Sequence, residues 1–226
     1  MKRFAGAMAA AVVILILAHP AWAEEENKLG KKLIDARDVY RELLATPDKS
    51  VPEALKKDCK CIAVIPHMIK GALGYGARFG QGVISCRQAS GGWSPPSFVR
   101  ITGGSIGLQI GGESTDLVLF FMTERGARSL LTGTKVTLGG KASVAAGPFG
   151  RSGEASTDLK LNAEIYSYGK SKGLFAGLSL EGARLAADSK ANARYYGKPV
   201  TVKQLLFEPS SIDVPAEGQD FRSALP

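Results

Sequence analysis

Apolar residues recur at three- and four-residue steps over residues 24–44, and this spacing predicts an amphipathic helix. Further along the chain the period changes to two. Bulky apolar residues alternate with Gly, Ala or Ser in the segments 103–112, 141–148 and 173–182, as in strands with one face against a core. The small residues indicate close approach of other backbone or side chains there. Residues 117–121 are apolar throughout, which indicates a central strand covered on both faces.

The remaining pattern predicts many short elements. Strands are expected at 61–65, 77–87, 98–102, 104–110, 116–122, 134–137, 141–146, 159–167 and 174–181. Short helices are expected at 51–57, 124–131, 188–196 and 202–207. Because strands and helices do not alternate regularly, the sequence predicts an α+β fold. Its sheet should be mostly antiparallel, folded as a sandwich or partly closed barrel, with an N-terminal amphipathic helix and short C-terminal helices.

Glycine and proline predict the connections between these elements. Residues 67–76 are expected to form a Gly-rich connection after the strand that stops at Pro66. Residues 91–96, Gly-Gly-Trp-Ser-Pro-Pro, are expected to form a tight turn that exposes Trp93. Residues 147–157 are expected to form a loop.

Three segments are predicted along the chain. Residues 1–23 have the pattern of a secretory signal peptide, with Lys2-Arg3, an apolar stretch over 4–18 and a small-residue cleavage site before Glu24. Residues 24–207, including the N-terminal helix, are expected to form one domain. Residues 208–226 carry several prolines and are expected to be a poorly ordered tail. We therefore expect an exported protein of the bacterial periplasm or cell envelope, peripheral to the membrane.

The three cysteines of the chain are Cys59, Cys61 and Cys86. An exported protein can form a disulfide. Cys61 opens one predicted strand and Cys86 closes the next, so an antiparallel pairing places these two opposite one another. Cys61–Cys86 is the preferred disulfide, and Cys59–Cys86 is the alternative. Zinc binding is disfavoured because Cys59 and Cys61 are closer in sequence than the usual ligand spacing and histidine partners are missing.

The charge of the chain indicates the kind of partner only in part. Its formal net charge is +8 and its sequence pI is about 9.4, which favours anionic partners. The positive charges are scattered and form no run longer than two residues. Scattered charge and predicted export both oppose nucleic-acid binding, so no nucleic-acid partner is expected.

Two short motifs match catalytic patterns, and both fail in context. Residues 103–107, Gly-Gly-Ser-Ile-Gly, match a hydrolase nucleophile elbow, but the next residues continue a strand and no histidine follows. Residues 167–170, Ser-Tyr-Gly-Lys, match a Ser-x-x-Lys pattern without its Lys-Thr-Gly partner, and are expected to form a turn. The one histidine outside the predicted signal, His67, cannot build a histidine-rich metal site. We predict no enzymatic activity, catalytic residue, metal or cofactor.

A series of ordered motifs over residues 50–207 resembles the SYLF domain family. The motifs are Cys61-Ile62-Ala63-Val64-Ile65-Pro66 with Lys70-Gly71, Gly80-Gln81-Gly82-Val83, Gly92-Trp93-Ser94-x-Pro96, Gly107-Leu108-Gln109-Ile110-Gly111-Gly112 before Thr115-Asp116, Ala145-Ala146-Gly147-Pro148 with Gly150, Tyr166-Ser167-Tyr168, and residues 173–182 with Tyr195-Tyr196-Gly197. The resemblance implies a phospholipid-binding module. In eukaryotic members it binds phosphoinositides with the help of an N-terminal amphipathic helix, and in fungi it bundles actin filaments.

This chain departs from those members because it carries a predicted export signal and no SH3 or zinc-finger domain. Actin is therefore an unlikely partner in its predicted compartment. We expect a non-enzymatic module that binds an anionic phospholipid, phosphoinositide-type lipids included, at a membrane surface. The alternative is a structural or protein-interaction module of the periplasm without a lipid ligand.

Cations near aromatic side chains suit anionic head groups and the membrane interface. On this basis the candidate lipid-binding residues are Lys70, Arg78, Trp93, Phe98, Arg100, Lys170, Lys172 and Phe175.

Overall fold

The computed structural model describes residues 19–46, 51–73, 75–106, 111–132, 136–139, 143–148, 163–209 and 212–226. Its helices are α2 (His19–Leu44), α3 (Glu53–Asp58), α4 (Glu124–Arg128), α6 (Ser189–Tyr195), α7 (Val202–Leu206) and α8 (Ala216–Ser223), with a 3-10 turn η2 (Ser129–Thr132). Its strands are β1 (Cys61–Leu73), β2 (Tyr75–Cys86), β3 (Ser97–Ile106), β4 (Gly111–Phe121), β5 (Val136–Thr137), β6 (Val144–Ala146), β7 (Ile165–Ser171), β8 (Leu174–Gly177) and β9 (Arg184–Ala187).

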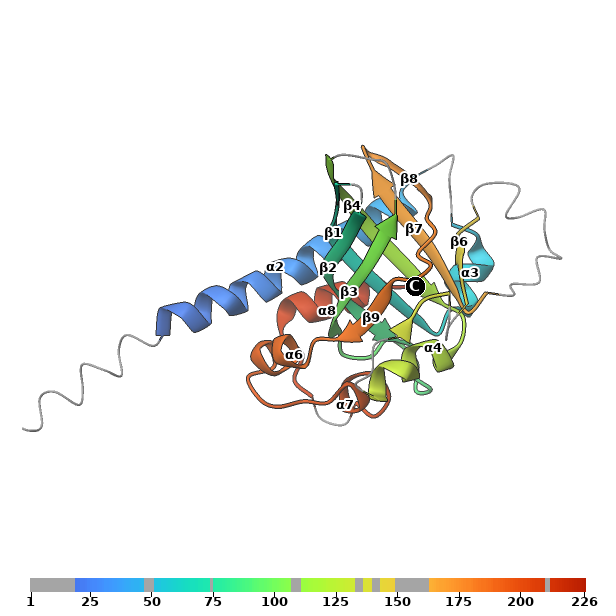
Figure 1. Ribbon diagram of the computed structural model, residues 1–226. Coiled ribbons are helices and arrows are strands. Elements are labelled where there is room, and N and C mark those ends of the chain that lie inside the picture. Colours follow the sequence, from blue (N-terminus) through green and yellow to red (C-terminus); the bar gives the residue numbers. More distant parts are fainter. Residues whose placement is uncertain are drawn as a thin grey trace, which may run out of the picture.

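Within the described residues, all nine strands belong to one sheet with the order β5-β9-β3-β2-β1-β4-β7-β6, and β8 pairs with β7. Every pairing is antiparallel except that of β6 with β7. The sheet curls into a half-barrel, and α2 lies across its outer face (Figure 1). The α+β prediction is confirmed, with the partly closed barrel as the correct form of the sheet.

Alternation along the central strands builds an apolar cluster on each face of the sheet. On one face, Leu33, Tyr40 and Leu43 of α2 pack with Ile62 and Phe120 of the sheet. The other face carries a second cluster from alternate residues of the same strands, to which η2 and α7 contribute. Strand β4 supplies both clusters, which confirms the prediction of a doubly covered strand at 117–121.

The predicted connection at 67–76 is wrong, because β1 runs on through Pro66 to Leu73 and β2 begins at Tyr75. Proline lacks the N–H that a central strand needs, and the chain solves this with a β-bulge. Pairing with β4 gains one residue on β1 between Ile65 and Met68. His67 adopts a φ of 54°, and its backbone N–H donates to Asp116 Oδ1 on β4 at 2.9 Å.

The glycine-rich stretch at 103–112 also differs from its prediction as a strand over 104–110. Gly103 and Gly104 lie within β3, Gly112 lies within β4, and residues 107–110 lie outside the described residues. The close packing that was expected of the segments 141–148 and 173–182 is present. A Cβ at Gly147 would lie 2.1 Å from the Tyr168 ring, and one at Gly177 would lie 2.7 Å from the backbone.

The C-terminal segment is not the poorly ordered tail that its prolines suggested. It contains α8, which contacts α2 and buries Phe221. Trp93 Nε1–H donates to the Pro226 carbonyl at 2.7 Å, and Arg222 Nε–H donates to the Trp93 carbonyl at 2.8 Å. The prediction failed because the local composition of residues 208–226 gives no information about their apolar contact with α2, which is distant in the sequence.

The preferred disulfide and the short helices predicted at 188–196 and 202–207 are confirmed. Cys61 and Cys86 pair directly between β1 and β2 and form a disulfide, whereas Cys59 is a free, buried thiol. Asp188 caps α6 by accepting from the Ala191 N–H, and Thr201 caps α7 in a capping box. None of the helices in the described part of the chain is long and apolar enough to cross a bilayer.

Candidate functional site

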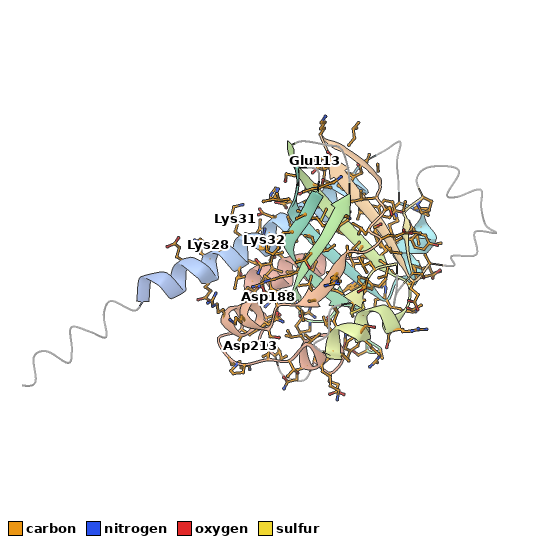
Figure 2. All side chains as sticks on the ribbon, viewed as in Figure 1. Lys28, Lys31, Lys32, Glu113, Asp188 and Asp213 are labelled. Carbon is orange, nitrogen blue, oxygen red and sulfur yellow. A yellow bond between two sulfur atoms is a disulfide. The ribbon has the colours of Figure 1, made fainter. Side chains whose placement is uncertain are left out.

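Two of the predicted cations are brought together by the β1–β2 pairing. Lys70 on β1 lies directly opposite Arg78 on β2, so both side chains project from the same face of the sheet. On the other side of Lys70, strand β4 places Glu113 opposite it. Figure 2 shows Glu113 at the end of the sheet where these strands stop. The row across three strands therefore carries two cations and one carboxylate.

Neither cation of this pair forms an ion pair with a described residue. No carboxylate among the described residues lies within 4.0 Å of Lys70 or Arg78. The Nε atom of Arg78 is buried and has no hydrogen-bond partner among the described residues. Burial lowers the pKa of the Arg78 guanidinium, because a low-dielectric environment disfavours its charged form. A buried donor without a partner is costly, and an acceptor such as an anion or a water molecule removes that cost.

Glycine makes room for the Arg78 side chain. A Cβ at Gly103 on β3 would lie 3.3 Å from Cγ and Cδ of Arg78 and 3.1 Å from Cα of Ala183. The guanidinium stem therefore lies over Gly103, between the sheet and the loop before β9. On the far side of the row, the Ser171 hydroxyl donates to Glu113 Oε1, which leaves Glu113 engaged with β7.

The other two predicted lysines differ from one another in their surroundings. Lys170 on β7 forms an ion pair with Glu42 of α2 and lies 5.8 Å from the Phe175 ring centroid. It therefore joins β7 to α2. Lys172 is exposed in the turn between β7 and β8, with a φ of 51°. The Ser171–Glu113 contact shows that this turn lies at the same end of the sheet as Lys70.

Arg100 and the three predicted aromatics belong to the framework. Trp93, Phe98 and Phe175 are buried, so the expectation of interfacial aromatics is wrong at all three positions. Phe98 packs against Tyr195 with ring centroids 5.3 Å apart. Arg100 Nε lies 2.6 Å from Asp188 Oδ2, which ties β3 to the cap of α6.

Three exposed apolar residues at the same end of the sheet were missed from the sequence. Ile69 and Phe79 are direct cross-strand partners with exposed fractions of 60% and 53%. Leu174, in the strand after Lys172, is 65% exposed. The available signal was the alternation of apolar and cationic residues in Ile69-Lys70 and Arg78-Phe79. Half of this signal is obscured because Ile69 and Lys70 fall in the predicted connection at 67–76, whereas Arg78 and Phe79 fall in the predicted strand at 77–87.

We call this region the hairpin end: residues 69–73 and 75–79 of β1 and β2, Glu113 of β4, and residues 171–174 around the β7–β8 turn. In Figure 1 these segments gather at one end of the half-barrel, opposite α7. The Arg100–Asp188 pair lies away from the hairpin end, as the separate labels of Glu113 and Asp188 in Figure 2 show.

The motifs that matched catalytic patterns have structural settings. Residue 105 lies within β3, not at a strand–helix elbow. Ser167 is buried in β7, where its hydroxyl contacts the carbonyls of Ala145 and Leu178, so the predicted turn at 167–170 is wrong. His67 is exposed, with Nδ1 3.5 Å from Asp116 Oδ1. Among the described residues no three His, Cys, Asp or Glu side chains gather as metal ligands.

Most of the chain is similar to part of several longer known proteins. A family model described as "Ysc84: Las17-binding protein actin regulator" matches residues 102–226. "SH3 domain-containing YSC84-like protein 1" of Rattus norvegicus is 36% identical over 179 residues, which cover 79% of this chain and 52% of that protein. "LAS seventeen-binding protein 3" of Saccharomyces cerevisiae is 36% identical over 189 residues, which cover 83% of this chain and 41% of that protein.

"Protein YSC84" of Saccharomyces cerevisiae is 38% identical over 161 residues, which cover 70% of this chain and 34% of that protein. The chain therefore spans about half the length, or less, of these curated relatives. Domains of this family are binding modules without catalytic function. The chain belongs to the Ysc84/SYLF domain family.

Proposed function

We propose that this protein is a non-enzymatic module that binds anionic phospholipid, phosphoinositide-type lipids included, at a membrane surface of the bacterial cell envelope. The observation that carries the proposal is the Lys70–Arg78 pair, two adjacent cations that form no ion pair with a described residue. The Arg78 Nε–H is buried and has no hydrogen-bond partner among the described residues. A lipid phosphate supplies the negative charge and the acceptor oxygens that this pair lacks.

Electrostatics alone would hold the module weakly. Lys70, Arg78 and Lys172 at the hairpin end are offset by Glu113, which leaves two positive charges. Each basic residue near an anionic membrane contributes about 1 kcal/mol, so the net contribution is about 2 kcal/mol. This corresponds to roughly 30-fold in partitioning, and the contribution falls with ionic strength.

The location in the envelope rests on the predicted signal peptide. Its cleavage point before Glu24 falls inside α2, ahead of Leu29, where burial against the domain begins. Processing there would leave the packed part of α2 in place. The Cys61–Cys86 disulfide suits an oxidising compartment.

Vesicle co-sedimentation of the protein purified after export and processing tests the proposal. We expect binding to phosphatidylcholine vesicles that contain anionic lipid, weaker binding at high salt, and little binding to phosphatidylcholine alone. The Lys70→Gln/Arg78→Gln variant should lose most of this binding. The matched control is Lys190→Gln/Lys198→Gln, which removes the same charge from exposed positions around α6. Absence of binding to every anionic vesicle at low salt would rule the proposal out.

A second candidate is a protein-interaction module, favoured by the printed descriptions of relatives as Las17-binding proteins and actin regulators. The chain shares only part of those proteins, and predicted export would separate it from actin. A stable complex recovered from envelope extract, together with no vesicle binding, would support this candidate over lipid binding.

A further inference from the structure

The central strands of the sheet leave an apolar surface uncovered at the hairpin end. Ile69 and Phe79 lie side by side on β1 and β2, on the same face that α2 covers farther along those strands. Their exposed fractions, 60% and 53%, are large for central-strand positions. Such positions normally pack against another layer, so an exposed apolar pair there marks a contact surface.

The residues beside this pair and toward the strand tips are small and uncharged. Thr102 of β3 lies beside Phe79, and Ser114 of β4 lies beside Ile69. The next row toward the tips is formed by small residues of the same four strands, Gly104, Ala77, Gly71 and Gly112. A Cβ placed at Gly71 or Gly112 meets nothing within 4 Å, so this surface is open as well as smooth.

The opposite face of the same hairpin is cationic. Lys70 and Arg78 occupy the positions next to Ile69 and Phe79, and strand alternation turns them to the other side. The β7–β8 turn repeats this combination with exposed Lys172 and exposed Leu174. Of the five large apolar side chains that are exposed among the described residues, three lie at this end: Ile69, Phe79 and Leu174.

We infer that the hairpin end is the membrane-inserting part of the molecule. Ile69, Phe79 and Leu174 enter the boundary between head groups and acyl chains, while Lys70, Arg78 and Lys172 contact lipid phosphates beside them. This inference rests on the proposed function and adds an orientation and an apolar anchor to it. The occupant is an anionic lipid surface because apolar side chains alternate with cations here, as at other interfacial membrane contacts.

The first test uses Ile69→Thr/Phe79→Thr in vesicle partitioning. Threonine keeps the strand propensity, and both side chains are more than half exposed, so the thermal transition should stay near that of the wild type. Each lost apolar contact should weaken partitioning about tenfold, and both together about 100-fold. The matched control, Ile34→Thr on α2, removes an apolar side chain that is 37% exposed away from the hairpin tips and should change partitioning little.

The second test places a fluorescent reporter at the same position. Phe79→Trp should show a blue-shifted emission with anionic vesicles and quenching by bromine-labelled lipid chains. Ser189→Trp, at the exposed start of α6, should show neither. Trp93 is buried and contributes a constant background.

The outcomes separate this inference from the proposed function. If the wild-type protein binds anionic vesicles and Ile69→Thr/Phe79→Thr binds equally well, the inserted orientation is wrong and lipid binding stands. If the wild-type protein binds no anionic vesicle at low salt, both the proposed function and the inference are wrong. A blue shift of Phe79→Trp that follows protein concentration without vesicles would assign the surface to a second copy of the chain and overturn the inference.

Discussion

The docking of α8 provides a quantitative test of the fold. Phe221 is fully buried, and α8 packs along α2. A Cβ at Gly30 of α2 would lie 3.2 Å from the Glu217 carboxylate, which shows how closely the two helices approach. Phe221→Ala removes the apolar side chain that holds this contact. We therefore expect a large loss of stability from one substitution near the C-terminus.

The magnitude follows from burial and from the ability of the site to relax. Core Phe→Ala substitutions cost about 3–5 kcal/mol, and the cost falls when the surrounding structure can close over the cavity. Helix α8 has only 8 residues, so partial closure is expected. We predict a loss of about 3 kcal/mol, a substantial part of the roughly 5–15 kcal/mol that a domain of this kind has in total.

Urea unfolding monitored by tryptophan fluorescence and by far-UV circular dichroism would measure the loss. Trp93 donates to the carbonyl of Pro226, so its emission also reports directly whether the C-terminal segment is docked. The neighbouring control is Asp220→Ala, which removes an exposed carboxylate whose ion pair with Arg37 spans 3.6 Å. That control should cost at most about 1 kcal/mol. A loss below about 1 kcal/mol for Phe221→Ala, with unchanged Trp93 emission, would refute the assignment of α8 to the folded core.

Three further predictions concern packing and cysteine chemistry. Gly147→Ala should destabilise the protein by about 1–3 kcal/mol, because its Cβ would lie 2.1 Å from an aromatic ring, whereas Gly112→Ala, with open space, should be nearly neutral in the same urea titration. Replacing both Cys61 and Cys86 by Ala should lower the unfolding free energy by about 3 kcal/mol, because the disulfide closes a separation of 25 residues; equal urea midpoints would contradict this. Burial raises the pKa of the Cys59 thiol to about 11, so alkylation at pH 8 should be slow in the folded protein and fast in urea; rapid labelling without urea would show that the thiol is accessible.

Part of the candidate site could be predicted from the sequence, because the sequence itself gives the charge of each residue. Lys70, Arg78 and Lys172 were chosen for their charge, and the structure brings them to one end of the sheet. The aromatic members of the prediction failed for a physical reason. Trp93 follows two glycines, yet its indole is buried against the C-terminal segment, a contact with residues more than a hundred positions away.

The exposed apolar pair could not be predicted by the same reasoning. A sequence pattern identifies Ile69 and Phe79 as apolar, and apolar residues in a strand are expected to be buried. Whether they are buried depends on which segment covers that part of the sheet, and α2 leaves them exposed. The connection predicted at 67–76 also obscured the alternation of Ile69 with Lys70.

The sequence by itself determined the local features of this protein and its family. The helical period set α2, the strand ends paired Cys61 with Cys86, and short-range hydrogen bonds set the caps at Asp188 and Thr201. Each of these features depends on residues close in sequence or on one pairing. Only the tertiary structure decided that β1 passes through Pro66, because that bulge is held by Asp116 on β4, far along the chain. The tertiary structure also decided the docking of α8 and the exposure of the two faces of the hairpin end. Exposure depends on which distant segment covers a surface, and local sequence patterns do not specify that segment.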